Sequence, residues 1–134
     1  MSATLSVVIP TWNHRDLLAE CLASLTAQSR PPEEIVVVDD GSTDDTLGFL
    51  REVFDEPQVK CIRQENSGAG AARNLGISLA EGDWVAFLDS DDVWRPRKVE
   101  HFLDALRENP GACFYYTAVS RSGDAPASLD ADED

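Results

Sequence analysis

Residues 84–92 run Trp84-Val85-Ala86-Phe87-Leu88-Asp89-Ser90-Asp91-Asp92, an apolar segment that ends abruptly in three carboxylates. The apolar part is typical of a buried strand, so the acids follow a strand's carboxyl end, where open α/β sheets bind their ligands. Three carboxylates so close together repel one another unless a positive group neutralises them. A hard divalent cation such as Mg²⁺ or Mn²⁺ that carries a phosphate would do so. The alternative is a solvated acidic turn before a helix, because acidic residues also favour helix N-termini.

Short apolar runs alternate with amphipathic helical windows along the chain. Strands are predicted at residues 5–9, 35–38, 59–62, 84–88 and 112–119, and helices at residues 17–25, 43–54, 71–80 and 95–108. This alternation is typical of a parallel sheet covered by helices on both faces. The predicted fold is therefore α/β, a mainly parallel three-layer sandwich in one domain of residues 1–119. Residues 120–134 lack the apolar content of a core and are predicted to be an acidic, disordered tail.

The composition limits the partners. The net charge of −14 argues against nucleic acid or an anionic membrane surface as the main partner. An anionic ligand would therefore need a metal, an Arg or backbone N–H groups. No apolar run is long enough to span a bilayer and no signal peptide opens the chain, so we expect a cytoplasmic protein, reaching the inner face of the membrane only through missing parts or partners. Cys21, Cys61 and Cys113 are interpreted as small core residues in a reducing compartment.

Polar residues also follow the first two predicted strands. Thr11-Trp12-Asn13 comes after the first strand, and Asp39-Asp40-Gly41-Ser42-Thr43 comes after the second. Asn13 is a candidate N-cap of the first helix, as are Ser42 and Thr43 for the second. A carboxylate at a strand end can also accept hydrogen bonds from a base N–H or a sugar hydroxyl, and two adjacent acids exceed what a cap requires. The histidines, His14 and His101, are interpreted as surface or cap residues, because neither has partners at metal-ligand spacing.

The segment Gly68-Ala69-Gly70-Ala71-Ala72-Arg73 fails the dinucleotide-binding fingerprint, because Arg73 replaces the third glycine and the segment follows the third strand. What remains is a glycine turn that opens a helix with a cation in its first turn. The helix dipole disfavours a cation there. We therefore expect an anion beside Arg73, either a phosphate oxygen or one of the clustered acids; an unpaired surface Arg is the alternative.

Four segments in this order and spacing strongly resemble glycosyltransferase family 2, the inverting enzymes of the GT-A fold. They are Val7-Val8-Ile9-Pro10-Thr11-Trp12-Asn13, Ile35-Val36-Val37-Val38-Asp39-Asp40-Gly41-Ser42-Thr43-Asp44, Gly70-Ala71-Ala72-Arg73-Asn74-Leu75-Gly76 and Asp89-Ser90-Asp91-Asp92. The resemblance covers residues 5 to about 118. It implies a metal-dependent transferase that binds a nucleotide-sugar donor, expected to be a UDP-sugar.

The resemblance also implies roles for single residues. Those implied for the nucleotide-sugar site are Pro10, Thr11, Asn13, Asp39, Asp40, Arg73, Asp89 and Ser90. The first three would line the base and ribose pocket, Asp40 or Asp39 would bond the base, and Arg73 would lie near the base or the diphosphate. Asp89 and Asp91 would form the family's D-x-D motif and hold Mn²⁺ or Mg²⁺, with Asp91 as the direct ligand. The metal would bridge the two phosphates and stabilise the departing nucleoside diphosphate.

The sequence departs from the family in one respect. The family's general base comes from a later segment, past the fifth strand, where this sequence has only the acids Asp124, Asp130, Asp132, Glu133 and Asp134. We therefore expect no catalytic base and no acceptor-binding half in this chain, and leave the acceptor unknown. The chain would be a truncated piece, a donor-binding remnant, or one part of an assembly, with a homo-oligomer formed through an exposed sheet face as one form.

Two other functions stay open as alternatives. One is a non-catalytic nucleotide-sugar-binding or interaction domain derived from such an enzyme. The other is a phosphatase or phospho-receiver, which needs a nucleophilic Asp supported by a Lys. Lys60 and Lys98 are the only lysines and neither ends a core strand, so the sequence argues against this second alternative.

Overall fold

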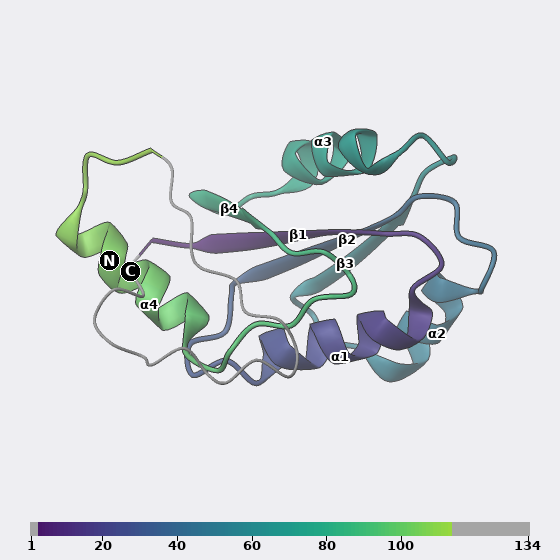
Figure 1. Ribbon diagram of the computed structural model, residues 1–134, viewed down its shortest axis with the longest axis horizontal. Helices are drawn as coiled ribbons and strands as arrows, with labels where there is room; N and C mark the ends of the chain where they lie inside the picture. The colour runs from purple at the N-terminus through teal and green to yellow at the C-terminus, as the bar shows by residue number, and fades with distance from the viewer. Residues whose placement is uncertain (1–2, 114–134) are drawn as a thin grey trace.

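The computed structural model describes residues 3–113, in which strands and helices alternate strictly. The strands are β1 (Leu5–Thr11), β2 (Glu34–Asp39), β3 (Val59–Arg63) and β4 (Trp84–Phe87); the helices are α1 (Arg15–Thr26), α2 (Thr46–Val53), α3 (Ala69–Leu79) and α4 (Lys98–Glu108). All strand pairs are parallel and the sheet order is β3-β2-β1-β4 (Figure 1). The predicted mainly parallel α/β fold is confirmed.

Strands β1 and β2 are buried along their whole length because alternate side chains enter two separate cores. Val7 and Ile9 of β1 pack with α1 residues such as Leu22 on one face of the sheet. On the other face, Val8 packs with Ala72 of α3. Helices α1 and α2 therefore cover one face and α3 the other (Figure 1), as the unbroken apolar strands predicted.

The strand order places β1 at the point where the connections change direction. The chain passes from β1 to β2 and β3 on one side, and then crosses to β4 on the other side of β1. In doubly wound sheets, the ligand crevice lies outside the carboxyl ends of the strands at such a switch point. A ligand site is therefore expected at the residues that follow β1 and β4.

Two helices begin later than the sequence predicted. Helix α2 begins at Thr46 because Asp45 has the left-handed φ of 55°, which a helical residue cannot adopt. The predicted caps are wrong, since neither Ser42 nor Thr43 occupies the N-cap position of α2. Asn13 is also not the cap of α1: its φ is 53°, and His14 occupies that position.

Helix α4 begins at Lys98, so Pro96 lies in the turn before the helix and not in its first turn. Residues 88–97 form an irregular connection between β4 and α4, which we call the acid loop because it carries Asp89, Asp91 and Asp92. Of the fifth predicted strand, residues 112–113 are not in a strand, and the rest lies outside the described residues, as does the predicted boundary at 119. No helix in residues 3–113 has the length and apolar character needed to cross a membrane.

Gly76 lets α3 approach the sheet closely. A Cβ atom built at this position would lie 2.3 Å from Cγ1 of Val8 in the central strand. Gly70, on the same helix, has no neighbour within 4 Å of the corresponding point. Close packing of α3 against the sheet therefore requires glycine at position 76 but not at position 70.

We expect Gly76→Ala to lower the free energy of unfolding by about 1–3 kcal/mol, because α3 must move away from Val8. The control Gly70→Ala should leave it unchanged or raise it by up to about 1 kcal/mol, since Ala is the better helix former. Urea denaturation of both variants measures the difference. Equal effects of the two substitutions would show that α3 does not depend on this close contact.

Candidate functional site

Polar loops converge where the predicted ligand crevice lies. The backbone N–H of Asp40 donates to the carbonyl oxygen of Thr11 (2.9 Å), and the N–H of Leu88 donates to that of Val8 (3.1 Å). These bonds extend the sheet pairing past the regular strands. The loops after β2 and β4 are thereby held against the end of β1, on either side of the switch point.

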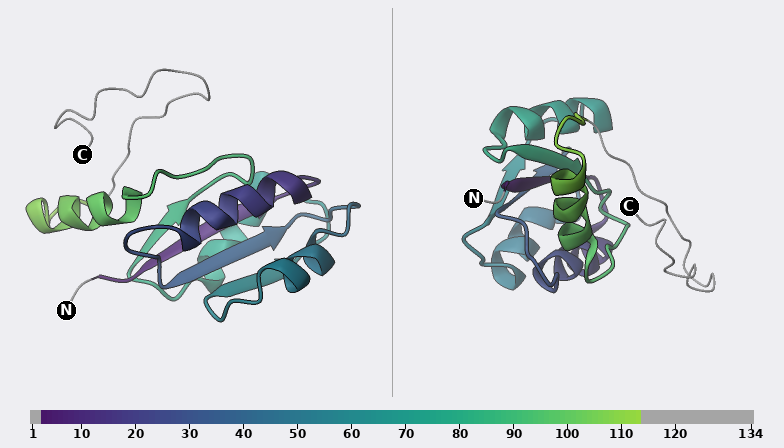
Figure 2. Two further views of the ribbon diagram at one scale, coloured as in Figure 1. Left: turned by 90° about the horizontal axis from the view of Figure 1, so that it is seen from below. Right: turned by 90° about the vertical axis from the view of Figure 1, so that its left-hand side faces the viewer.

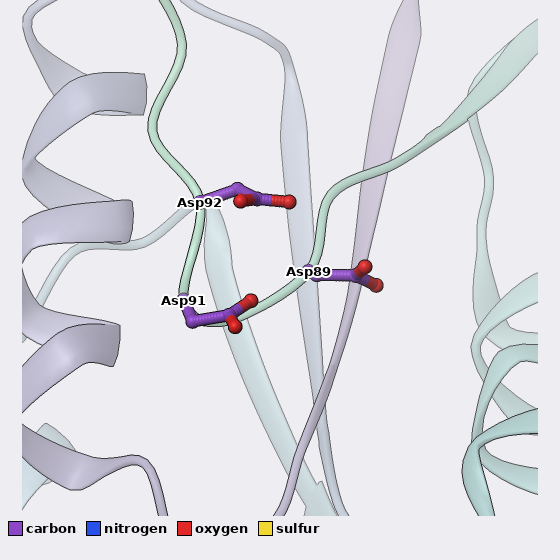
Figure 3. A group of neighbouring side chains, drawn as sticks. All are labelled: Asp89, Asp91 and Asp92. Atoms are coloured by element: carbon purple, nitrogen blue, oxygen red, sulfur yellow. The ribbon is translucent and has the colours of Figure 1, made fainter. Parts of the chain in front are cut away.

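The acid loop brings three carboxylates together at this edge (Figure 3). Asp89, Asp91 and Asp92 are all exposed, and each offers one carboxylate oxygen within 4.8 Å of the others. Partial burial, together with the charges of Asp91 and Asp89, raises the pKa of Asp92. The mutual repulsion predicted from the sequence is therefore present. Clustered carboxylate oxygens are the ligands that hard divalent cations prefer.

Arg73 reaches this cluster from α3, on the other face of the sheet. One guanidinium nitrogen, Nη2, lies 3.1 Å from Oδ1 of Asp89. The prediction that an anion lies beside Arg73 is confirmed, and in the structure that anion is one of the clustered acids. Both side chains are more than a third exposed, so the pair contributes little to stability. Its significance is that a cation and the acid cluster share one site.

Asp39 and Asp40 are buried and hold the neighbouring loops. The Asp39 carboxylate accepts hydrogen bonds from the backbone N–H of Ser42 and from the guanidinium of Arg63. The Asp40 carboxylate accepts from the Gln64 amide and from the backbone N–H groups of residues 67 and 68. From the sequence, two adjacent acids exceed what a cap requires. In the structure, the hydrogen bonds of Asp39 and Asp40 hold the loops after β2 and β3.

The pKa of Asp40 reflects two opposing causes. Burial disfavours the charged form, but the three hydrogen bonds from Gln64, Ser67 and Gly68 outweigh it, and the pKa is lowered. The carboxylate form of Asp40 is therefore the one that supports the entry into α3.

The three residues predicted to follow β1 in the site have different surroundings. Pro10 is buried within the strand. Thr11 is 3% exposed, and its hydroxyl oxygen is a buried side-chain atom with no hydrogen-bond partner among residues 3–113. The side-chain oxygen of Asn13 accepts a hydrogen bond from the backbone N–H of Thr43 (2.8 Å), and the backbone N–H of Asn13 donates to Ser42 Oγ (2.9 Å). Asn13 therefore ties the loop after β1 to the loop after β2.

An open cavity of about 420 Å³ lies beside Asp39 and Asp40, lined by Gly41, Arg63, Gln64, Glu65 and Asn66. Sequence reasoning missed all of the residues from β3 and the turn after it. The sequence could have indicated them. They lie at the carboxyl end of a predicted strand, and the same position relative to a strand was the reason for selecting Asp39 and Asp89.

Ser90 is buried, and its hydroxyl lies 3.0 Å from Nδ1 of His14 at the start of α1. His14 was interpreted as a surface or cap residue; it is at the cap position of α1 but also contacts the acid loop. Nothing local in the sequence indicates this pairing, because 76 residues separate the two.

The cysteines differ from one another. Cys21 is buried, and its pKa is raised to about 12, first by burial and then by the charges of Asp92, Asp91 and Asp89. A thiol that stays protonated is not a nucleophile. Cys61 is half-buried. Cys113 is exposed, so its interpretation as a core residue is wrong.

Comparison with known proteins gives a consistent result. The model of the family described as "Glycosyl transferase family 2" matches residues 6–130. TuaG of Bacillus subtilis, named as a teichuronic acid biosynthesis glycosyltransferase, is 40% identical over 127 residues, which cover 93% of this chain and 50% of TuaG. Chondroitin synthase of Escherichia coli is 40% identical over 114 residues, covering 84% of this chain and 17% of the synthase.

Among solved structures, S. aureus TarS 1-349 in complex with UDP-GlcNAc superimposes with a TM-score of 0.74 at 35% identity. The alignment covers 80% of this chain and 32% of the TarS chain. The chain thus spans half or less of the length of each of these relatives.

We expect Asp40→Asn to lower the free energy of unfolding by about 2–3 kcal/mol at pH 7, because an amide cannot accept all the hydrogen bonds that the carboxylate accepts. The pKa of Asp40 is lower in the folded state, so its contribution is present above the unfolded pKa and is lost as the pH falls through the folded pKa. The gap between wild type and variant should therefore narrow below about pH 4.

Urea denaturation between pH 7 and pH 3 measures this gap. Asp55→Asn, at an exposed position, is the control and should change stability by less than about 0.5 kcal/mol. A gap that stays constant over the whole pH range would contradict the role of the ionised carboxylate.

Proposed function

Because this chain belongs to glycosyltransferase family 2, we propose that its described residues bind a nucleotide-diphospho-sugar donor and that the whole protein transfers the sugar to an acceptor with inversion at the anomeric carbon. The observation that carries the proposal is the acid cluster beside Arg73, at the switch point of the sheet. That position is where doubly wound sheets bind nucleotides.

A divalent metal is the second part of the proposal. A nucleoside diphosphate is an anion, and a chain with a net charge of −14 repels it unless local cations compensate. We propose that Asp91, with Asp89, holds Mn²⁺ or Mg²⁺, because their exposed carboxylate oxygens lie close enough together to share one ion. When bound, the ion would supply a Lewis acid that stabilises the charge on the departing nucleoside diphosphate. Arg73 would add a second positive charge beside it.

The base is proposed to bind in the cavity lined by residues 41 and 63–66. The complexes of TarS with UDP and with UDP-GlcNAc support a uridine nucleotide for this chain also. Of the two buried acids, Asp40 is the candidate for a hydrogen bond to a base N–H, because it is 6% exposed whereas the side chain of Asp39 is completely buried in its pair with Arg63. The loop after β1, which Asn13 holds, lies at the same sheet edge and is proposed to contact the ribose.

Wild-type protein should bind UDP in the presence of Mn²⁺ and lose that binding when the metal is chelated. Asp91→Asn should weaken UDP binding at least about tenfold, because it removes the proposed direct ligand. Isothermal titration calorimetry measures both effects. Asp104→Asn, on α4, is the matched control and should bind as wild type does. An Asp91→Asn protein that binds metal and UDP normally would refute the metal assignment.

Arg73→Ala should weaken UDP binding about 10- to 150-fold, the effect of losing a charge-assisted hydrogen bond, and should leave uridine binding nearly unchanged. Arg73→Lys is the control, since it keeps the charge without the planar fork, and it should recover part of the loss. Competition titrations with UDP and uridine separate the two ligands. If both ligands weaken equally, Arg73 contacts the nucleoside and not the diphosphate.

Release of sugar from the donor distinguishes a transferase from a binding domain. Donor hydrolysis or transfer by a protein that binds UDP with Mn²⁺ would support the enzyme. In a full-length protein that contains this chain, metal-dependent binding without turnover would favour the alternative of a non-catalytic nucleotide-sugar-binding domain.

A further inference from the structure

We propose that α1 acts as a template for the acid loop, and that His14 is the positioning residue that fixes the backbone carrying Asp89 and Asp91. The proposal rests on the proposed function, because that function gives the acid loop its ligand. It goes further by assigning a role to residues that lie outside the acid cluster.

The template is a stripe of side chains along one side of α1 and the turn that follows it: His14, Cys21, Ser24 and Gln28. Their spacings of seven, three and four residues place them on one face of a helix. The acid loop runs along this helix in the same direction as the helix (Figure 2), so Trp94 and Arg95 contact later residues of the stripe than Asp89 and Ser90 do.

Side chains of the stripe bond several backbone groups of the loop. The Cys21 thiol donates to the carbonyl oxygen of Asp89 (3.6 Å), and Ser24 Oγ accepts from the N–H of Trp94 (3.1 Å). Gln28 bonds the backbone on both sides of the turn that leads into α4. Its amide donates to the carbonyl oxygen of Arg95 (2.6 Å), and its carbonyl accepts from the N–H of residue 99 (3.0 Å). The loop has no strand or helix of its own over residues 88–97, so side chains of α1 and of the turn after it supply part of the hydrogen bonding that regular structure would supply.

Ser90 is the point at which the template meets the acid cluster. It is 4% exposed, whereas its neighbours Asp89 and Asp91 are exposed. Its hydroxyl lies 3.0 Å from Nδ1 of His14, and either group can donate, depending on the histidine tautomer. Holding Ser90 against α1 therefore fixes the backbone on both sides of it, from which the two carboxylates project.

This anchor opposes a real force. Three like charges within 4.8 Å of one another favour any loop conformation that moves them apart. Without the bond from His14, the loop would gain such conformations, and binding a metal would require the carboxylates to be gathered again. The bond thus keeps the site in a conformation ready for its ligand.

Hydrogen–deuterium exchange of the full chain tests the anchor without any ligand. His14→Ala and Ser90→Ala should each raise exchange at least about threefold in peptides that cover residues 88–97, and leave peptides of β2 and β3 unchanged. The double variant should exchange no faster than either single variant, because both remove the same bond. His101→Ala, on α4, is the matched control.

The conservative variants separate the bond from general packing. In His14→Asn, the amide group can occupy the position of Nδ1, and slow exchange should be retained. In His14→Gln, the amide lies near the position of Nε2, and exchange should be fast, as in His14→Ala. Equal behaviour of the Asn and Gln variants, or unchanged loop exchange in His14→Ala, would overturn the proposal.

A second arm measures Mn²⁺ affinity by electron paramagnetic resonance of the free ion. We expect His14→Ala to weaken binding about 5- to 30-fold, the loss of one hydrogen bond, with no change for His101→Ala. Faster loop exchange with unchanged Mn²⁺ affinity would overturn the positioning role. Wild-type protein that binds no Mn²⁺ would overturn the proposed metal site instead, and loop exchange then decides alone whether His14 anchors the loop.

Discussion

The parallel pairing of β1 with β2 on one side and β4 on the other is the constraint on which the rest depends. Strand β1 is buried on both faces and paired on both edges. The chain that follows it can therefore reach solvent only beyond the carboxyl end of the strand. The loops that follow β1, β2 and β4 must share that space. Asn13, Asp40 and Asp89 come from three different loops, and the sheet brings them to one edge. The strand order therefore determines where the site lies, and the side chains determine what it can bind.

Electrostatics then determines what the edge can bind. The site concentrates negative charge in a chain that is already acidic, yet the proposed ligand is itself an anion. Such an arrangement makes sense only with cations between protein and ligand. Arg73 supplies one within the chain, and the clustered carboxylates are suited to hold another. The three carboxylates of the acid loop repel one another, and this repulsion destabilises the loop conformation that holds them together. The contacts of the loop with His14 and α1 stabilise that conformation.

The residues of the strands show what the sequence could predict. Val and Ile runs identified the buried strands, because few other structures bury such runs from both sides. An anion beside Arg73 was foreseen because a cation in a first helical turn requires compensation, but the sequence left open whether it would be a phosphate or one of the clustered acids. The late start of α2 was missed, since an Asp with a positive φ leaves no mark in the sequence. The late start of α4 was missed because nothing local in the sequence shows that Gln28, in the turn after α1, bonds the carbonyl oxygen of Arg95. His14 and Ser90 meet only in the fold.

The most direct test is a crystal structure of the full chain grown with UDP and Mn²⁺, with the ion located by its anomalous signal. We predict one Mn²⁺ bound by Asp91 and Asp89, the diphosphate on that ion near Arg73, and the uracil in the cavity at residues 63–66. Mn²⁺ bound away from the acid loop, or UDP bound at another edge of the sheet, would contradict this prediction.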